Sequence, residues 1–317
     1  MTAQFTLEEI VNATHGYLVQ GDGGQSDSGR VVWLPDQIGP GDWFLAMSCG
    51  GEDSHDYIES AFERSARGCI IEGRRASLSR LDRTNTIISV DDTKTALWQL
   101  AGSWRRKVAP KVVAVTGSVG RKETIAFLEF LVRKQFRCHV AIDSGALGSL
   151  PGFFSMPADT ELLIVEASGA NRGEVARTGN FARPDMAVIT AAHHPLPSPK
   201  RNARNAALYG EILETLCLEN PVFEKLAVVN DRNPVLQERV DAILKDDNSA
   251  VLSGNVSNIS TAALAWISEA SGVSPDAEQV DVSAWCAVTA AACLGLSMEE
   301  MPHIVSEVIV KAGSYRA

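Results

Sequence analysis

One glycine-containing segment, residues 112–124, has the pattern of a phosphate-binding loop. It reads V-V-A-V-T-G-S-V-G-R-K-E-T, so an apolar strand runs into the turn 117–120 and a helix follows. This layout directs backbone N–H groups and the positive end of a helix dipole towards a phosphate. A loop that transfers phosphoryl groups also needs a lysine for the β- and γ-phosphates and a Ser or Thr hydroxyl for Mg²⁺. The residues after Gly120 therefore decide which chemistry the segment can do.

Those residues are Arg121, Lys122 and Glu123, which differ from the lysine and hydroxyl side chains of a working loop. Arg121 stands at the lysine position. If Lys122 is instead the catalytic lysine, Glu123 falls at the hydroxyl position and brings a negative charge to the phosphates unless it turns away. Arginine can pair with phosphate but is bulkier than lysine and not equivalent to it. The candidate nucleotide-binding residues are Thr116, Gly117, Ser118, Val119, Gly120, Arg121, Lys122, Glu123 and Thr124.

Two interpretations of this loop stay open. In one, the amides of residues 117–120 bind a nucleotide or another anion, with Arg121 or Lys122 as the counter-charge and the candidate catalytic cation. In the other, the segment is an inherited strand–turn–helix that binds nothing.

Alternating strands and helices are expected to hold the loop in place. After residue 108 the sequence predicts strands at 111–116, 138–142, 162–166, 186–190 and 226–230, and helices at 122–134, 173–180, 202–219, 234–244, 282–294 and 298–308. Apolar strands that alternate with helices favour a mainly parallel sheet covered on both faces. Right-handed crossovers then place the loops that follow the strands along one edge, where ligands of α/β proteins bind.

The segment before residue 109 indicates a smaller α/β domain. It predicts strands at 31–34, 43–47, 68–72 and 86–90, and helices at 5–16 and 56–67. Thr6 is the expected N-cap of the first helix, and Glu9 three residues later completes a capping box. The basic segment W-R-R-K-V-A-P at 104–110 is the expected junction, which divides the chain into domains 1–108 and 109–317.

Composition narrows the classes of function. The chain has 317 residues, of which 45% are hydrophobic and 21% charged, and a formal net charge of −10. That charge is unfavourable for nonspecific binding of nucleic acid. The sequence has no N-terminal signal pattern and no apolar run of about 18 residues that would span a membrane. Its six cysteines are scattered without a C-x-x-C pair, which favours reduced thiols in a cytoplasmic protein over disulfides or a zinc site.

Several segments resemble one enzyme family in their order along the chain. Residues 39–46 read G-P-G-D-W-F-L-A, residues 53–58 D-S-H-D-Y-I, residues 166–174 E-A-S-G-A-N-R-G-E, residues 183–190 R-P-D-M-A-V-I-T and residues 290–295 A-A-A-C-L-G. The first four, together with T-G-S-V-G at 116–120, resemble the motifs P-G-D-L-F-x-A, D-G-H-x-F, E-x-G-A-N-x-x-G-E, R-P-x-x-A-V-I-T-N and T-G-S-x-G-K-T-T of the Mur ligases. Residues 290–295 resemble the alanine-rich helix that ends the ATP domain of this family. The likeness is strongest to the members that add D-alanyl-D-alanine. These enzymes join amino acids or peptides to UDP-muramyl precursors using ATP.

The resemblance implies an N-terminal UDP-sugar-type domain, a central ATPase-type domain, and ATP and Mg²⁺ as cofactors. It places Asp53, Ser54 and His55 near the pocket for a UDP-muramyl-type substrate, although this turn is also a good helix cap. Because the sequence stops at Ala317, where the family's third domain would begin, a C-terminal ligase domain is expected to be absent.

The same resemblance makes Glu166 and His193, or its neighbour His194, the ligands of Mg²⁺. This hard cation prefers carboxylate and water oxygens in octahedral geometry, so one acid with one histidine is a sparse site. The simpler interpretation is an acid at a strand end and a histidine in a loop.

Several positions that carry the family's chemistry hold other residue types here. Ala191 replaces the asparagine after the strand 186–190, and Tyr209 replaces the lysine that becomes carbamylated and holds a second Mg²⁺. Arg232 replaces an acid of the N-x-D-D element, and Ser283 replaces the adenine-contacting asparagine. The family's D-S-R triplet, which would fall near residues 34–36, is missing.

These departures favour a degenerate Mur-ligase homologue that binds a partner protein, a second copy of itself or a nucleotide-sugar without forming an amide bond. A second hypothesis is an ATP-dependent carbon–nitrogen ligase completed by another chain. In it Lys122 replaces the loop lysine, Glu166 and His193 hold Mg²⁺, ATP phosphorylates a carboxylate and an amine attacks the acyl phosphate. A third is that the chain is part of a longer protein.

Overall fold

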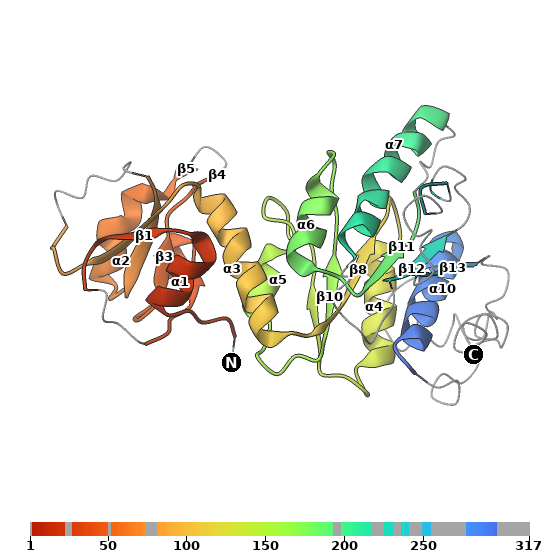
Figure 1. The fold of residues 1–317 in the computed structure, drawn as a ribbon, viewed down its shortest axis with the longest axis horizontal. Coiled ribbons are helices and arrows are strands. Elements are labelled where there is room, and N and C mark those ends of the chain that lie inside the picture. Colours follow the sequence, from red (N-terminus) through yellow and green to blue (C-terminus); the bar gives the residue numbers. More distant parts are fainter. Residues whose placement is uncertain are drawn as a thin grey trace. The chain divides into compact units, whose positions relative to one another are not determined.

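The chain folds into two compact α/β units (Figure 1). The computed structural model describes residues 2–22, 27–49, 52–73, 81–192, 198–216, 225–230, 236, 238–240, 249–254 and 277–296. The first unit contains Met1–Val108 and Phe153–Ala158, and the second contains Ala109–Gly152 and Asp159–Ala317. The sequence did not indicate that the short segment Phe153–Ala158 packs with the first unit.

The first unit is built on a five-stranded sheet in the order β1-β7-β6-β3-β2. All neighbouring strands are parallel except β1 and β7, which are antiparallel. Its elements are α1 Leu7–Thr14, β1 Tyr17–Gln20, β2 Val31–Val32, β3 Trp43–Leu45, β4 Ser48–Cys49, β5 Glu52–Asp53, η2 Ser54–Tyr57, α2 Ile58–Glu63, β6 Gly68–Glu72, β7 Thr86–Val90 and α3 Thr93–Val108. The predicted strands 68–72 and 86–90 are confirmed to the residue. The predicted helix 56–67 is shorter, because a 3-10 turn precedes α2 and the helix ends at Glu63.

A capping box and the buried indole of Trp43 hold the N-terminal segment of this unit in place. The predicted capping box is confirmed: the Glu9 N–H donates to Thr6 Oγ1 at 3.2 Å, and the Thr6 N–H donates to Glu9 Oε2 at 2.8 Å. Trp43 is fully buried, and its Nε1 donates to the Phe5 carbonyl at 2.9 Å. Trp43 is therefore a core residue whose one polar atom is satisfied, as a buried indole requires.

The sequence did not predict helix α3, whose last turn contains residues 104–108 of the expected junction. Trp104 is buried there, and its Nε1 donates to the Met156 carbonyl at 3.0 Å. The buried positions Leu97, Leu100, Ala101 and Trp104 recur at helical spacing, a period that the basic run conceals. Arg105–Lys107 at the end of α3 suit the negative end of the helix dipole.

The second unit is a six-stranded sheet in the order β13-β12-β11-β8-β10-β9, and every neighbouring pair is parallel. This confirms the predicted parallel sheet. Its elements are β8 Lys111–Thr116, α4 Arg121–Val132, β9 Cys138–Ala141, α5 Leu150–Ser155, β10 Leu162–Glu166, α6 Glu174–Ala182, β11 Met186–Ile189, α7 Pro199–Tyr209, η4 Gly210–Thr215, β12 Lys225–Asn230, β13 Ser249–Gly254 and α10 Ala277–Cys293. Strand β13 was not predicted, and α5 continues from this unit into the segment that packs with the first.

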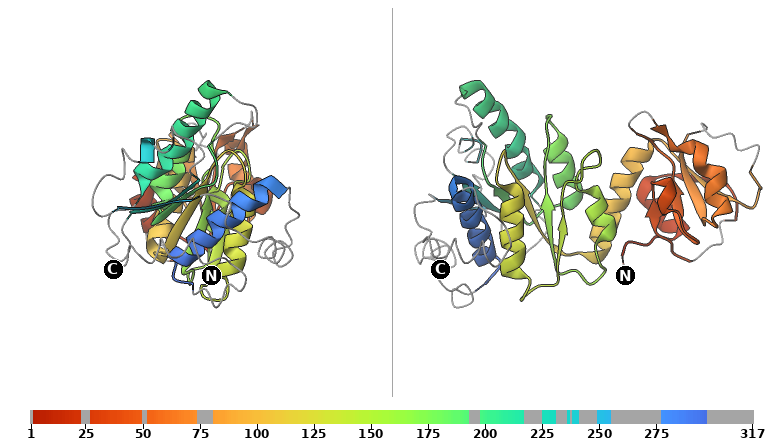
Figure 2. Two further views of the ribbon diagram at one scale, coloured as in Figure 1. Left: turned by 90° about the vertical axis from the view of Figure 1, so that its right-hand side faces the viewer. Right: turned by 180° about the vertical axis from the view of Figure 1, so that it is seen from behind.

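Helices cover both faces of this sheet (Figures 1 and 2). On one face, Val113, Val115 and Ile164 pack against α4 and α10. On the other face, Ala114 and Ala187 pack against α6, α7 and η4. Consecutive residues of β8 thus point to opposite faces and both are buried, which explains why the strand is apolar throughout.

Strand β8 lies at the centre of this sheet, and the direction of strand progression reverses there. The chain proceeds from β8 to β9 and β10 on one side, and then to β11, β12 and β13 on the other. Ligands of open α/β sheets bind beyond the carboxyl end of the strand at such a switch point. The turn after β8 is therefore the first place to look for a ligand site.

The predicted helix 298–308 and most of the predicted helix 234–244 lie outside the described residues. Within the part of the chain that the structure describes, no helix combines the length and apolar character needed to cross a membrane.

Candidate functional site

The predicted phosphate loop, residues 117–120, connects β8 to α4. Thr116 ends β8, is fully buried, and donates from Oγ1 to the Ala167 carbonyl at 2.6 Å. Gly117 and Gly120 have positive φ angles of 141° and 78°. A Cβ on Gly117 would lie 2.3 Å from Thr190 Oγ1. Both the backbone conformation and the packing at Gly117 therefore require glycine.

Three hydrogen bonds tie the loop to neighbouring elements. The Ser118 N–H donates to the Ala191 carbonyl at 2.8 Å, and Thr190 Oγ1 donates to the Val119 carbonyl at 2.5 Å. Ser283 Oγ, on α10, donates to the Gly120 carbonyl at 3.2 Å. Ala191 and Ser283, two positions singled out by the resemblance, thus contact the loop directly and hold its backbone.

The first turn of α4 supplies unused backbone donors. The N–H groups of Arg121, Lys122 and Glu123 have no acceptor among the described residues, and the N-cap Gly120 has no side chain to cap them. Such N–H groups, at the positive end of a helix dipole, suit an anion. The side chain of Lys122 is exposed, that of Glu123 is half-buried, and Thr124 is buried.

The side chain of Arg121 turns back onto the loop instead of extending into solvent. Its Nε donates to Glu166 Oε1 at 3.0 Å, and its Nη1 donates to the Gly117 carbonyl. The Glu166 side chain is fully buried, while 23% of the Arg121 side chain is exposed. The second oxygen, Glu166 Oε2, accepts from the Asp143 N–H at 3.0 Å. Arg121 is therefore the counter-charge of a buried carboxylate.

The predicted metal site is only partly visible. Glu166 lies at the carboxyl end of β10, as a ligand beside the loop would, but His193 lies outside the described residues, as does His194. The pair therefore stays a prediction. Tyr209 is buried in the apolar cluster beneath α7. Within the described ranges, no group of three His, Cys, Asp or Glu side chains could hold a metal ion.

Three polar residues at this edge of the sheet were missed by sequence reasoning. Ser168 Oγ donates to the Asp143 carboxylate, and Glu211 accepts from the Gly173 N–H with both oxygens, at 2.9 and 3.0 Å. Asp143 follows β9 and Ser168 follows β10. Because the carboxyl ends of parallel strands share one edge, a search for polar residues after each predicted strand would have found these two.

The predicted substrate-binding residues of the first unit make local contacts. The Glu72 N–H donates to His55 Nε2 at 3.3 Å, so Nδ1 carries the ring proton and donates to Asp53 Oδ1 at 2.5 Å. Ser54 Oγ donates to the Met47 carbonyl at 3.0 Å and accepts from the Met47 N–H at 2.8 Å. The hydrogen bond from His55 lowers the pKa of Asp53. These contacts stabilise the turn, and a role of Asp53, Ser54 and His55 in substrate binding stays a prediction.

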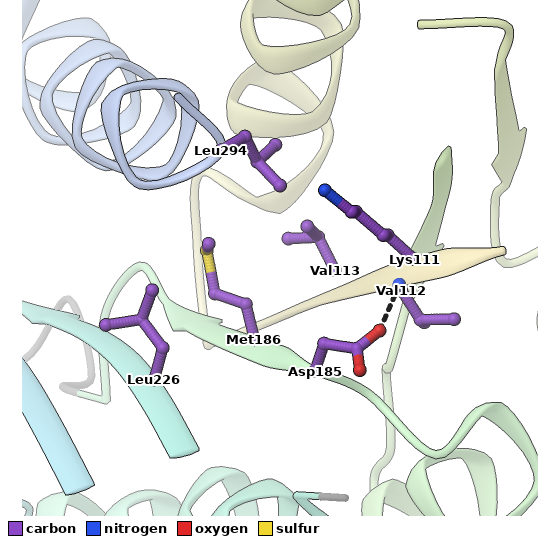
Figure 3. Close-up of a pocket in the computed structure, with 7 residues that line it drawn as sticks. All are labelled: Lys111, Val112, Val113, Asp185, Met186, Leu226 and Leu294. Carbon is purple, nitrogen blue, oxygen red and sulfur yellow. Dashed lines mark hydrogen bonds between the residues drawn. The ribbon is translucent and has the colours of Figure 1, made fainter. Parts of the chain in front are cut away.

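A small cavity in the second unit lies away from the loop (Figure 3). It is lined by residues at the amino-terminal ends of the central strands and by Leu294, which follows α10. Its acid, Asp185, accepts from the Val112 N–H at 2.8 Å. Its walls are mostly apolar, its carboxylate is already bonded, and Lys111 Nζ lies over the Phe136 ring, so the cavity is not built as a phosphate site.

The comparisons with known proteins identify the fold of this chain. No protein-family model matches the chain. The UDP-N-acetylmuramoyl-tripeptide–D-alanyl-D-alanine ligase of Bacillus subtilis is 31% identical over 149 residues, which cover 46% of this chain and 32% of that enzyme. The match with the solved D-alanyl-D-alanyl ligase of Acinetobacter baumannii covers 95% of this chain and 68% of that enzyme's chain. Its TM-score is 0.76 and the sequence identity is 20%. The chain has the Mur-ligase fold.

The matched regions cover only part of the length of the related enzymes. The matched parts are 32% and 35% of the first two curated relatives, so the chain spans about a third of their length. The match with a solved Mur ligase of Thermotoga maritima, in complex with ADP, covers 71% of this chain and 50% of that enzyme's chain. Its TM-score is 0.60 and the sequence identity is 24%.

Removal of the Arg121 charge should destabilise the second unit. Arg121→Met leaves the fully buried Glu166 carboxylate without its counter-charge, and we expect a loss of about 3 kcal/mol in the free energy of unfolding. Chemical denaturation followed by circular dichroism would measure it, and hydrogen exchange of β8 and α4 would localise it. The matched control is Lys122→Met, an exposed neighbour, which should change stability by no more than about 0.5 kcal/mol. Equal losses in both variants would contradict the assignment.

A second prediction separates loop packing from backbone strain. Gly117→Ala and Gly145→Ala both place a side chain at positive φ, but only the Cβ at Gly117 meets other atoms within 4 Å. We expect Gly117→Ala to cost about 2 kcal/mol more than Gly145→Ala, since a side chain forced into filled space shifts its neighbours. Urea denaturation of the two variants measures the difference. Similar midpoints would mean that the loop moves to accept a methyl group.

The turn in the first unit should respond to acid. A carboxyl group whose pKa is lowered on folding stabilises the protein above its unfolded pKa, and this stabilisation is lost as pH falls through the folded pKa. Asp53→Asn should therefore cost about 0.5 kcal/mol at pH 7, and the cost should disappear below the depressed pKa of Asp53. Denaturation midpoints measured from pH 7 to pH 2.5 test this. Asp56→Asn, at a neighbouring exposed acid, is the matched control for the loss of one carboxylate, and a cost of Asp53→Asn that stays the same down to pH 2.5 would contradict the prediction.

Proposed function

We propose that this chain is a MurF-like protein of peptidoglycan-precursor metabolism that binds its ligand without forming an amide bond. In this proposal the first unit corresponds to the UDP-sugar-type domain and the second to the ATPase-type domain of Mur ligases. The ligand is a UDP-muramyl-type nucleotide-sugar or a partner protein, which includes a second copy of the chain. Similarity to D-alanyl-D-alanine-adding ligases supports the pathway.

The observation that carries this proposal is the engagement of Arg121 with Glu166. Phosphoryl transfer depends on positioned positive charge, from a loop lysine and Mg²⁺, around the transferred group. Here the loop cation is hydrogen-bonded to a buried carboxylate and to the Gly117 carbonyl. Lys122 is exposed on α4, and the loop has no hydroxyl at the following position, which is Glu123. The groups that would stabilise a transferred phosphate are thus engaged elsewhere or replaced.

The substitutions around the loop support the same proposal. Ala191 offers only its backbone carbonyl, Ser283 spends its hydroxyl on the Gly120 carbonyl, and Tyr209 is packed among apolar side chains. Each residue contributes to folding at a position where the resemblance implies contact with ATP or metal.

We also propose a cytoplasmic location. Burial raises the pKa values of the Cys69 and Cys286 thiols, and burial together with Glu129 raises that of Cys138 to about 12. The raised pKa values disfavour the thiolate form of these cysteines, and none of them forms a disulfide among the described residues. Such cysteines fit a reducing compartment.

A second candidate function is an ATP-dependent carbon–nitrogen ligase completed by another chain. The unused N–H groups at the start of α4 favour it, as does the activity named for the relatives. ATP would transfer its γ-phosphoryl group to a carboxylate, which gives an acyl phosphate and ADP. An amine would then attack the acyl carbon and release phosphate. This reaction requires Arg121 to leave Glu166, or Lys122 to turn towards the loop.

Isothermal titration calorimetry separates the two functions. The binding proposal predicts saturable heat with UDP-N-acetylmuramoyl-tripeptide, and neither Mg²⁺-dependent heat at millimolar ATP nor ATP turnover. Saturable binding of Mg²⁺–ATP that Lys122→Ala abolishes would favour the ligase instead. Lys134→Ala is the matched control, because it removes the same charge from an exposed position just after α4. A chain that binds neither nucleotide-sugar nor ATP would leave only the protein-partner form of the proposal, which size-exclusion chromatography with light scattering tests for a second copy.

A further inference from the structure

The carboxylates at the ligand edge of the second unit are occupied by donors of the protein itself. Glu166 accepts from Arg121 and from the Asp143 N–H. Asp143 accepts from the Gly145 N–H at 2.8 Å and from Ser168 Oγ. Glu174 accepts from the N–H groups of residues 170 and 171, at 2.8 and 3.2 Å, and the Gly173 N–H bonds Glu211.

Mg²⁺ does not fit these residues. It requires near-octahedral oxygen ligands at short range, and the carboxylate best placed beside the loop already holds a guanidinium group. A dication brought to Glu166 would have to displace Arg121 or lie beside it, and two like charges at a few ångströms repel each other strongly in a buried site. Glu123 is the one acid at the loop without a donor among the described residues, and it would have to bind the cation alone while Arg121 stays on Glu166.

We infer that Arg121 takes the place of the divalent cation at this loop, so that the site carries a fixed guanidinium charge and excludes metal. The single positive charge of Arg121 neutralises the single negative charge of Glu166, which completes the charge balance without an ion. The guanidinium group has five N–H donors, and two of them have acceptors among the described residues. A phosphate-bearing ligand at this loop would bind the unused N–H groups at the start of α4 without a bridging metal.

This inference concerns the site of the proposed function but can be tested without its ligand. The probe is Mn²⁺ alone, titrated into the full chain and followed by electron paramagnetic resonance of the free ion. Mn²⁺ binding by the wild-type chain should not depend on Glu166, so Glu166→Gln should leave it unchanged. Arg121→Gln should create a submillimolar site, because it frees the Glu166 carboxylate. The double variant Arg121→Gln/Glu166→Gln should lose that site again.

Two further variants keep the test decisive. Arg133→Gln removes an arginine from the opposite end of α4 and should leave Mn²⁺ binding as in wild type, which controls for net charge. If Arg121→Gln fails to fold, Arg121→Lys/Lys122→Thr/Glu123→Thr restores the lysine and hydroxyl pattern of a working loop and should gain the Mn²⁺ site. Wild-type Mn²⁺ binding that depends on Glu166 would overturn the inference. So would the absence of new binding in the folded variants, because Arg121 would then not be what excludes the metal.

Discussion

A carboxylate buried away from water needs a compensating positive charge, and Glu166 has no exposed side-chain surface. Its position at the end of β10 is set by the sheet, so the partner must reach it from the turn after β8. Arg121, the first residue of α4, does so. The same guanidinium group bonds the Gly117 carbonyl, which ties the two ends of the turn together. The shape of the loop and the charge balance of the site thus depend on one ion pair.

The parallel sheet explains why this pair forms here. Strand β8 lies between β10 and β11 at the point where strand progression reverses, so the turn after it faces residues from both neighbours. Thr190 and Ala191 follow β11 and bond the turn from one side, while Glu166 ends β10 on the other. Ser283 of α10 adds a bond to Gly120. A segment in this position is suited to a ligand, and here its contacts are with the protein.

The sequence predicted the framework of this site well, because its strands are apolar on both faces and end in recognisable turns. The bounds of β6, β7, β8 and β10 follow from their apolar runs alone. The helical face of α3 was missed, because the basic run at its end was interpreted only as the junction between the domains. Side-chain pairing lay beyond sequence reasoning altogether. Arg121 and Glu166 are 45 residues apart, and nothing in the spacing shows that the arginine folds back onto its own loop.

The pairing of Arg121 with Glu166 explains why an arginine suits position 121. A lysine at position 121 would bring its charge as a single ammonium group, without the planar fork that lets Arg121 bond Glu166 and Gly117 at once. In this structure the charge of Arg121 is therefore used within the fold, where it balances the buried carboxylate of Glu166. Lys122 is exposed on α4 and Tyr209 is packed among apolar side chains, so neither side chain replaces that charge beside the loop.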